Sequence, residues 1–185
     1  MADPELSIRP LRRAEYDKLV LMGAFQGERI ELLEGRLVHM SPIGAPHSST
    51  VEKLTLLCVR RLGDVARVRI QSPFAALDTS EPEPDVAIVP LANYEEDHPT
   101  RADLLIEVAE SSLAYDRGPK LRVYAEAGVP EYWIVNLVNR RIDVHRKPSS
   151  GRYWQVQQLD EDATVQCERY PPLEFRVGDV LPRRP

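Results

Sequence analysis

The sequence has few cysteines and no long apolar run. Its 185 residues include only 2 cysteines, Cys58 and Cys167, which form no CxxC pair and have no histidine close by. We therefore predict two buried free thiols, and neither a disulfide nor a zinc site. No apolar run approaches the roughly 20 residues that span a bilayer, and the first residues lack the basic-then-apolar order of a signal peptide. We expect a cytoplasmic protein that does not contact a membrane.

An excess of positive charge is also missing. The chain has 24 Lys and Arg against 29 Asp and Glu, which gives a formal net charge of −5. Broad attraction to nucleic acid depends on clustered Lys and Arg, so any contact with nucleic acid must be local. Low-complexity tracts are absent too, and 43% hydrophobic residues suit a folded protein. At this length we predict one domain over residues 1–185.

The spacing of apolar and turn residues predicts an α/β chain. Helical spacing predicts helices over 13–22 and along the stripe of Val51, Leu54, Cys58 and Leu62. Glu34-Gly35 predicts a hairpin turn between strands 29–33 and 36–40. A third helix, capped by Asp116, is predicted to run to about residue 127. Further strands are predicted over 65–71, 74–77, 85–89, 104–109, 130–135, 141–146, 153–158 and 173–177.

Two carboxylates stand where strand residues should be apolar. In the run LLIEVA, Glu107 shares its strand face with Leu105 and Ala109. A buried carboxylate must be protonated, paired with a cation or bound to a metal. Asp85 begins the preceding strand, so antiparallel pairing of the two strands would bring Asp85 beside Glu107. Two adjacent carboxylates repel each other unless a cation lies between them.

The following helix supplies a lysine to this pair. Asp116, Lys120 and Tyr124 recur at four-residue intervals and can face the strand end as one stripe. Lys120 could neutralise the acids, or hold and deprotonate a water molecule. Carboxylate oxygens beside a lysine suit Mg²⁺ or Mn²⁺. The reaction that uses this set of groups is metal-assisted hydrolysis of phosphodiester bonds.

Four runs resemble a known family. They are IELLEGRLVHMSP followed by His47, EPDVAIV, LLIEVAESS and YDRGPKLRVYAEAGVPEYWIV. Together they resemble the Uma-two family of restriction endonucleases over about residues 13 to 146. The resemblance implies a PD-(D/E)xK nuclease fold, which has a mixed β-sheet core flanked by helices. An N-terminal helix and hairpin and extra C-terminal strands would be added to that core.

The resemblance also implies a role for individual residues. Pro84-Asp85 matches the PD of the motif and Glu107 its second acid. The lysine of the motif usually stands two residues after the second acid, but this position holds Ala109. The resemblance implies that in this family the lysine comes from the following helix, where Lys120 matches it. Glu31 matches an additional N-terminal acid that would complete the metal site. Asn136 replaces a common Asp and affects only a peripheral polar contact.

Each candidate residue also has a structural interpretation. Glu107 and Lys120 could form a buried ion pair without catalysis. Asp85 could accept hydrogen bonds in a turn, and Glu31 could be an exposed hairpin acid. His47, on the stripe of the second helix, could pack near the helix terminus, or it could reach the metal or a phosphate. Asp116 could simply cap a helix, and Tyr124 could be an aromatic residue of the core.

Two functions therefore compete. The first is a Mg²⁺-dependent endodeoxyribonuclease with Asp85, Glu107 and Glu31 as ligands and Lys120 as the catalytic lysine, working as a two-fold dimer by analogy with enzymes that cut both strands. The second is an inactive nuclease-fold module that binds nucleic acid or protein. A phosphoesterase acting on RNA or a small phosphate ester is a third possibility. The arginines 60, 61, 67, 69, 140, 141 and 146 and Lys147 are the visible candidates for phosphate contacts.

Overall fold

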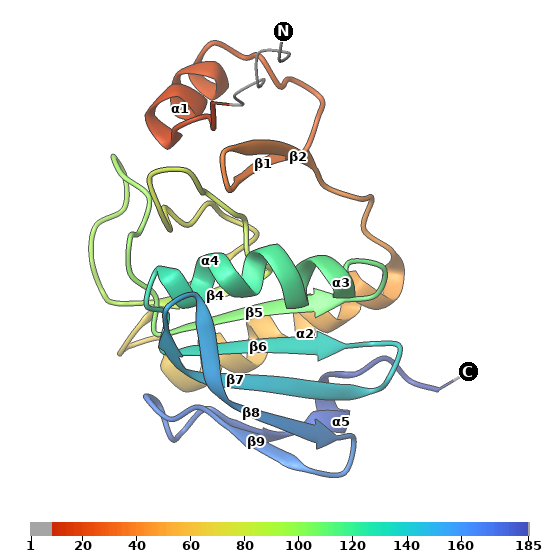
Figure 1. The fold of residues 1–185 in the computed structure, drawn as a ribbon. Helices are drawn as coiled ribbons and strands as arrows, with labels where there is room; N and C mark the ends of the chain where they lie inside the picture. The colour runs from red at the N-terminus through yellow and green to blue at the C-terminus, as the bar shows by residue number, and fades with distance from the viewer. Residues whose placement is uncertain (1–8, 185) are drawn as a thin grey trace, which may run out of the picture.

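A six-stranded mixed sheet lies at the centre of the computed structural model, which describes residues 9–184 (Figure 1). The strand order is β3-β4-β5-β6-β7-β8. β5 and β6 are parallel, whereas all other neighbouring pairs in this sheet are antiparallel. The strands are β3 (Arg67–Ile70), β4 (Val86–Val89), β5 (Leu104–Ala109), β6 (Glu131–Asn136), β7 (Arg141–Ser149) and β8 (Arg152–Asp160).

Helices cover both faces of this sheet. In Figure 1 the helices α3 (Leu113–Tyr115) and α4 (Leu121–Glu126) lie in front of the sheet, and α2 (Ala45–Leu62) lies behind it. Helix α1 (Arg13–Leu21) and the hairpin of β1 (Ile30–Leu33) and β2 (Arg36–His39) form the N-terminal part. This arrangement confirms the predicted α+β fold with a mixed sheet flanked by helices. Among residues 9–184, no helix is long and apolar enough to cross a membrane.

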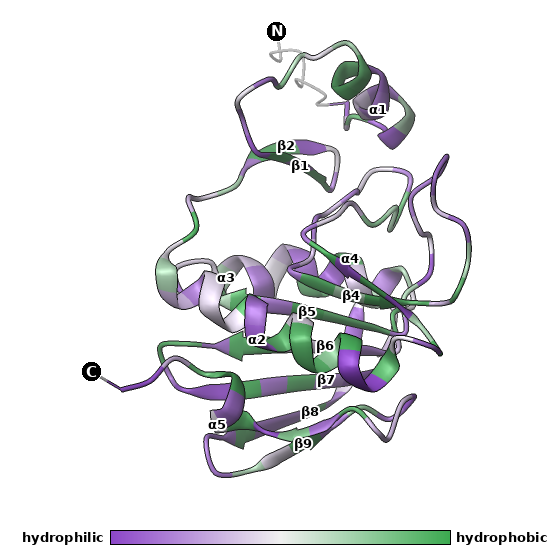
Figure 2. Cartoon of the chain, turned by 180° about the vertical axis from the view of Figure 1, so that it is seen from behind, coloured by the Kyte–Doolittle hydropathy of each residue, from purple (hydrophilic) through white to green (hydrophobic). Residues whose placement is uncertain are grey.

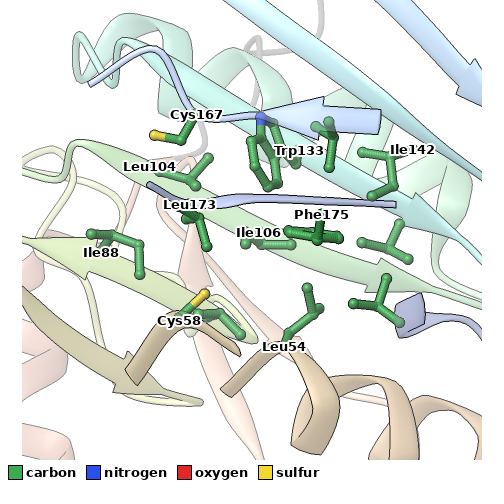
Figure 3. Packing of buried hydrophobic residues seen from close by; sticks show 14 of the residues in the cluster. Leu54, Cys58, Ile88, Leu104, Ile106, Trp133, Ile142, Cys167, Leu173 and Phe175 are labelled. Atoms are coloured by element: carbon green, nitrogen blue, oxygen red, sulfur yellow. The ribbon is translucent and has the colours of Figure 1, made fainter. Parts of the chain in front are cut away.

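The central strands are buried on both faces. Every residue of β4, β5 and β6 is buried, and β4 and β5 are largely coloured as hydrophobic in Figure 2. Figure 3 shows Leu54 and Cys58 of α2 packed toward Ile106 on one side of the sheet, where Phe175 also lies. Cys58 and Cys167 are both buried and free, as predicted. Asp85, just before β4, and Glu107, within β5, therefore belong to the buried centre of the sheet.

The C-terminal strands complete the core on the α2 side. β9 (Thr164–Gln166) and β10 (Glu174–Arg176) form a separate antiparallel pair, and α5 (Val177–Val180) follows. The sequence predicted only the second of these strands, as 173–177. β8 is also longer than predicted, because its pairing with β7 extends from Ser149↔Arg152 beside the hairpin tip to Arg141↔Asp160 at the far end.

The predicted strand over residues 74–77 is wrong. These residues are irregular: the amide of Phe74 bonds to the carbonyl of Pro82, and that of Ala75 bonds to Pro99. Only Leu77 forms an isolated bridge, with Ser80. Prolines cannot donate hydrogen bonds to a ladder, and they are frequent on both sides of this stretch, so apolar residues alone do not make it a strand.

Candidate active site

Antiparallel pairing of β4 and β5 places Asp85 beside Glu107. Val86 pairs with Ile106, so the residue before β4 lies opposite Glu107 when the register is continued by one position. The amide of Val108 donates a hydrogen bond of 2.8 Å to Oδ2 of Asp85. Both acids are buried, with 7% and 3% of their surface exposed. The two strands thus bring the two carboxylates together.

Asp85 accepts further hydrogen bonds from two side chains. His47, in the first turn of α2, lies 3.0 Å from Oδ2 through its Nε2 atom, and Gln71 donates to Oδ1 at 3.1 Å. Burial raises the pKa of Asp85, but His47, the Val108 amide and Gln71 together outweigh burial and leave the pKa below its ordinary value. Asp85 is therefore held in its ionised form.

Lys120 lies between two of the acids. Its Nζ atom is 2.9 Å from Oε1 of Glu107 and 3.4 Å from Oε2 of Glu31, and 5% of the residue is exposed. Burial lowers the pKa of Lys120, but the charges of Glu107, Glu31 and Asp116 raise it above its ordinary value. The lysine therefore remains an ammonium ion at neutral pH. It serves as a charge and a hydrogen-bond donor rather than as a base.

Two further contacts fix the positions of Glu31 and Glu107. The amide of Glu83 donates a hydrogen bond of 3.1 Å to Oε2 of Glu31, which ties the hairpin to the segment before β4. The hydroxyl of Tyr124 donates a hydrogen bond of 2.7 Å to Oε1 of Glu107, the atom that Lys120 also contacts. Oε1 of Glu107 thus accepts two hydrogen bonds, and its position is well defined.

The site holds more acid than base. The pKa of Glu107 is raised to about 8. Burial is the main cause; the charges of Asp116, Asp85 and Glu31 act in the same direction, and Lys120 opposes them. Burial likewise raises the pKa of Asp116. At neutral pH Glu107 therefore keeps much of its proton in the metal-free chain, and a cation bound beside it would favour the ionised carboxylate.

Asp116 does not cap the start of the helix, contrary to the prediction from the sequence. The helix begins at Leu113 after Ser112, and Asp116 is the first residue of the π-helical turn η1 (Asp116–Lys120), which leads into α4. Its Oδ2 atom accepts a hydrogen bond of 2.6 Å from the Ser112 hydroxyl. The prediction failed because the helix starts earlier than Pro119 suggested. The wider π turn accommodates this proline, and such turns are frequent at functional sites.

These side chains surround one cavity of about 290 Å³. Six of the predicted residues line it: Glu31, His47, Asp85, Glu107, Asp116 and Lys120. Tyr124 does not line the cavity and instead supports Glu107 from the fully buried side. The sequence did not identify Glu83 or Arg29, which also line the cavity. The alternation of EPEPD could have indicated Glu83, because it stands two residues before Asp85.

The family can now be stated from a comparison of the whole chain. The model of a family named Uma2, described as "Putative restriction endonuclease", matches residues 13–180. The chain belongs to the Uma2 family. Its structure is similar to the crystal structure of a "putative nuclease belonging to DUF820" from Anabaena variabilis ATCC 29413, with a TM-score of 0.73 and 16% identity over 92% of this chain and 97% of that chain. At this identity the likeness shows the fold. No curated protein matches the chain.

The carboxylate oxygens of the Uma2 site are the type of ligand that a hard divalent cation binds. No hydrogen bond from the described residues reaches Oε2 of Glu107 or Oε1 of Glu31, and Oδ1 of Asp85 accepts only one. Each acid thus keeps an oxygen with capacity for a ligand bond. Within residues 9–184, however, no three His, Cys, Asp or Glu side chains are arranged so that they could hold a metal ion directly. Lys120 lies where Glu31 and Glu107 would converge.

Several of the candidate phosphate-binding arginines have structural roles. Arg146 is 9% exposed and donates to Oε1 of Glu131, whose Oε2 accepts the Glu168 amide. Its guanidinium group is therefore engaged inside the fold and does not face a phosphate, because strand pairing places Glu131 directly opposite. Two other arginines pair with acids, Arg140 with Glu161 and Arg141 with Asp143.

Asn136 also lies away from the cavity. It ends β6, and its side-chain oxygen accepts a hydrogen bond of 2.9 Å from the amide of Asn139 in the turn that leads to β7. It does not line the cavity. Asn136, which stands where the family often has Asp, therefore stabilises this turn and does not contribute to the cavity.

Proposed function

We propose that this Uma2 protein is a Mg²⁺-dependent endodeoxyribonuclease. The observation that carries the proposal is that Glu31, Asp85 and Glu107 all line one cavity, where Lys120 donates a hydrogen bond to Glu107 and lies 3.4 Å from Glu31. Oxygen ligands of this kind suit Mg²⁺ or Mn²⁺. DNA as the substrate follows from the family's description as a restriction endonuclease.

In this proposal Glu31, Asp85 and Glu107 would hold the metal ion. A bound divalent ion would supply charge stabilisation at the phosphate and a water molecule of lowered pKa. The ammonium group of Lys120 would donate a hydrogen bond to the phosphate oxygen on which negative charge develops. His47 keeps Asp85 ionised and oriented, and Tyr124 fixes the carboxylate of Glu107. The cavity is lined by several carboxylates, which would repel the negatively charged phosphate of a substrate. A bound metal ion would offset this repulsion.

We also propose that the protein acts as a homodimer. A duplex has two antiparallel strands, and two copies related by a two-fold axis present two equivalent sites to them. This part of the proposal rests on the requirement of the reaction and not on the geometry of the cavity.

A nicking assay tests the proposed activity. Supercoiled plasmid, RNA and a small phosphodiester are incubated side by side with Mg²⁺ or Mn²⁺. The native chain is expected to nick the plasmid, and Glu107→Gln and Lys120→Met are expected to lose at least about a hundredfold in rate. Lys18→Met is the matched control, because Lys18 is exposed on α1. Nicking that continues unchanged in Glu107→Gln and Lys120→Met would overturn the proposal.

A second candidate is a module that binds without catalysis. Its supporting observation is that Lys120 already satisfies Glu107 and Glu31 as a buried ion pair. Calorimetric titration of Mn²⁺ separates the two candidates. The nuclease requires heat of binding in the native chain that is lost in Glu107→Gln, whereas equal, negligible heats in both chains would favour the module.

A further inference from the structure

The two edges of the central sheet differ in how they are protected. β3 forms one edge and has only four residues, two of which are arginines. Short, charged edge strands resist pairing with another chain. β8 forms the other edge with nine residues, and Trp154 and Val156 on it are 71% and 55% exposed. A long edge strand with exposed apolar side chains is a template for strand pairing.

The outer edge of β8 forms no ladder with the rest of the described chain. Its ladder partner is β7, and among residues 9–184 the only further backbone bond of the strand is from the Ala163 amide to the carbonyl of Asp160. β9 and β10 pair with each other and not with β8. The strand is therefore free to form a second ladder.

The sequence of β8 is complementary to itself in the antiparallel direction. In the run RYWQVQQLD, a two-fold axis through Val156 places Val156 opposite its own copy and Trp154 opposite Gln158. The same axis places Arg152 opposite Asp160 at both ends of the ladder. All five of these residues are exposed. An apolar pair at the centre and opposite charges at the ends stabilise antiparallel strands.

The two charged residues have no other ion partner. No salt bridge or side-chain hydrogen bond in the described part of the chain involves Arg152 or Asp160, although fourteen ion pairs occur elsewhere. A shift of the register by two residues would remove both ion pairs. The charges therefore select one register.

We propose that β8 pairs with β8 of a second copy of this chain, antiparallel and about a two-fold axis at Val156. The two central sheets then join into one continuous sheet. The interface is isologous, because each copy contributes the same strand. This inference stands on the edge strand alone and does not depend on the proposed nuclease activity.

Exchange of the charges tests both the interface and its register. Arg152→Glu sets acid against acid at both ends of the ladder, and Asp160→Lys sets base against base. Each is expected to raise the dimer dissociation constant about tenfold or more in analytical ultracentrifugation. The combined variant, Arg152→Glu with Asp160→Lys, is expected to dimerise like the native chain.

A mixing experiment gives the strongest test. In an equimolar mixture of Arg152→Glu and Asp160→Lys, a heterodimer regains opposite charges at both ends, so the mixture is expected to dimerise more tightly than either variant alone. Arg67→Glu, at the exposed start of β3, is the control and should leave dimerisation unchanged. A native chain that stays monomeric at all concentrations would overturn the proposal, and so would a dimer that is insensitive to these variants. Circular dichroism checks that every variant is folded.

Discussion

The ammonium group of Lys120 donates a hydrogen bond of 2.9 Å to Oε1 of Glu107, and both side chains are more than nine-tenths buried. In the metal-free chain the lysine thus supplies the positive charge that the acid cluster requires. A divalent ion bound by Glu107 and Glu31 would have to share these carboxylates with the lysine. The lysine would then assist the reaction and oppose metal binding at the same time.

Lys120→Met is therefore expected to bind Mn²⁺ about tenfold more tightly than the native chain, because a competing charge a few ångströms away is removed. Isothermal titration calorimetry measures this change. Lys18→Met should bind like the native chain, since Lys18 is exposed on α1. Weaker binding by Lys120→Met would mean that the lysine supports the metal site instead of competing with it.

The stability of the metal-free chain should fall as pH rises. Burial raises the pKa of Glu107 to about 8 from an ordinary 4.5. Between these values the folded chain keeps a proton that the unfolded chain has lost, so the free energy of unfolding decreases with a slope of at most about 1.4 kcal/mol per pH unit for this group. Urea unfolding across this pH range should give a flatter slope for Glu107→Gln.

Glu52→Gln is the control for this pH dependence, because Glu52 is exposed on α2. It should keep the native slope. Glu81, whose pKa burial raises to about 7, contributes a similar slope that remains in both variants. An unchanged slope in Glu107→Gln would show that Glu107 is ionised in the folded chain.

His47→Ala should move the acid limb of the nicking profile to higher pH. His47 lies 3.0 Å from Asp85 and helps to keep its pKa low against the effect of burial. Without the imidazole, Asp85 would take up a proton at a higher pH and lose its capacity to hold the metal. His39→Ala is the matched control, because His39 lines the same cavity but makes no hydrogen bond to Asp85. Identical pH profiles for the native chain and His47→Ala would contradict this role.

Tyr124→Phe and Tyr153→Phe form a matched pair. Each removes a hydroxyl that donates one buried hydrogen bond, from Tyr124 to Glu107 at 2.7 Å and from Tyr153 to the carbonyl of Val129 at 2.9 Å. Each should lower the free energy of unfolding by about 1 kcal/mol. Only Tyr124→Phe should also weaken Mn²⁺ binding, because Glu107 loses the contact that fixes it. Equal Mn²⁺ affinities in the two variants would leave Tyr124 with a purely structural role.

Local rules were sufficient for much of the site. Strand periodicity pointed Glu107 inward, and the antiparallel pairing of β4 with β5 then brought Asp85 beside it. Glu34 and Gly35 both adopt positive φ, 50° and 74°, as the predicted hairpin turn requires. The four-residue spacing of Lys120 and Tyr124 also predicted correctly that both face the same strand, where they contact Glu107.

Features that depend on pairing between segments distant in the sequence could not be predicted from local patterns. The role of Arg146 depends on Glu131, fifteen residues earlier on the neighbouring strand, and only the register of β6 with β7 brings them together. β9 was missed because three residues carry too little periodic signal, and its pairing with β10 makes it a strand. The irregular stretch at 74–77 shows the opposite case, in which apolar residues lack a ladder partner.

The π-helical turn at Asp116–Lys120 makes this segment sensitive to chain length. Such a turn accommodates one residue more than an α-helical turn, and each residue rotates the following side chains by about 100° around the axis. Deletion of Gly118, where an added side chain would meet open space, would shorten the spacing between Asp116 and Lys120 and turn Asp116 away from the face that Lys120 and Tyr124 share. In designed variants of this segment, keeping the number of residues is therefore more important than keeping each residue type.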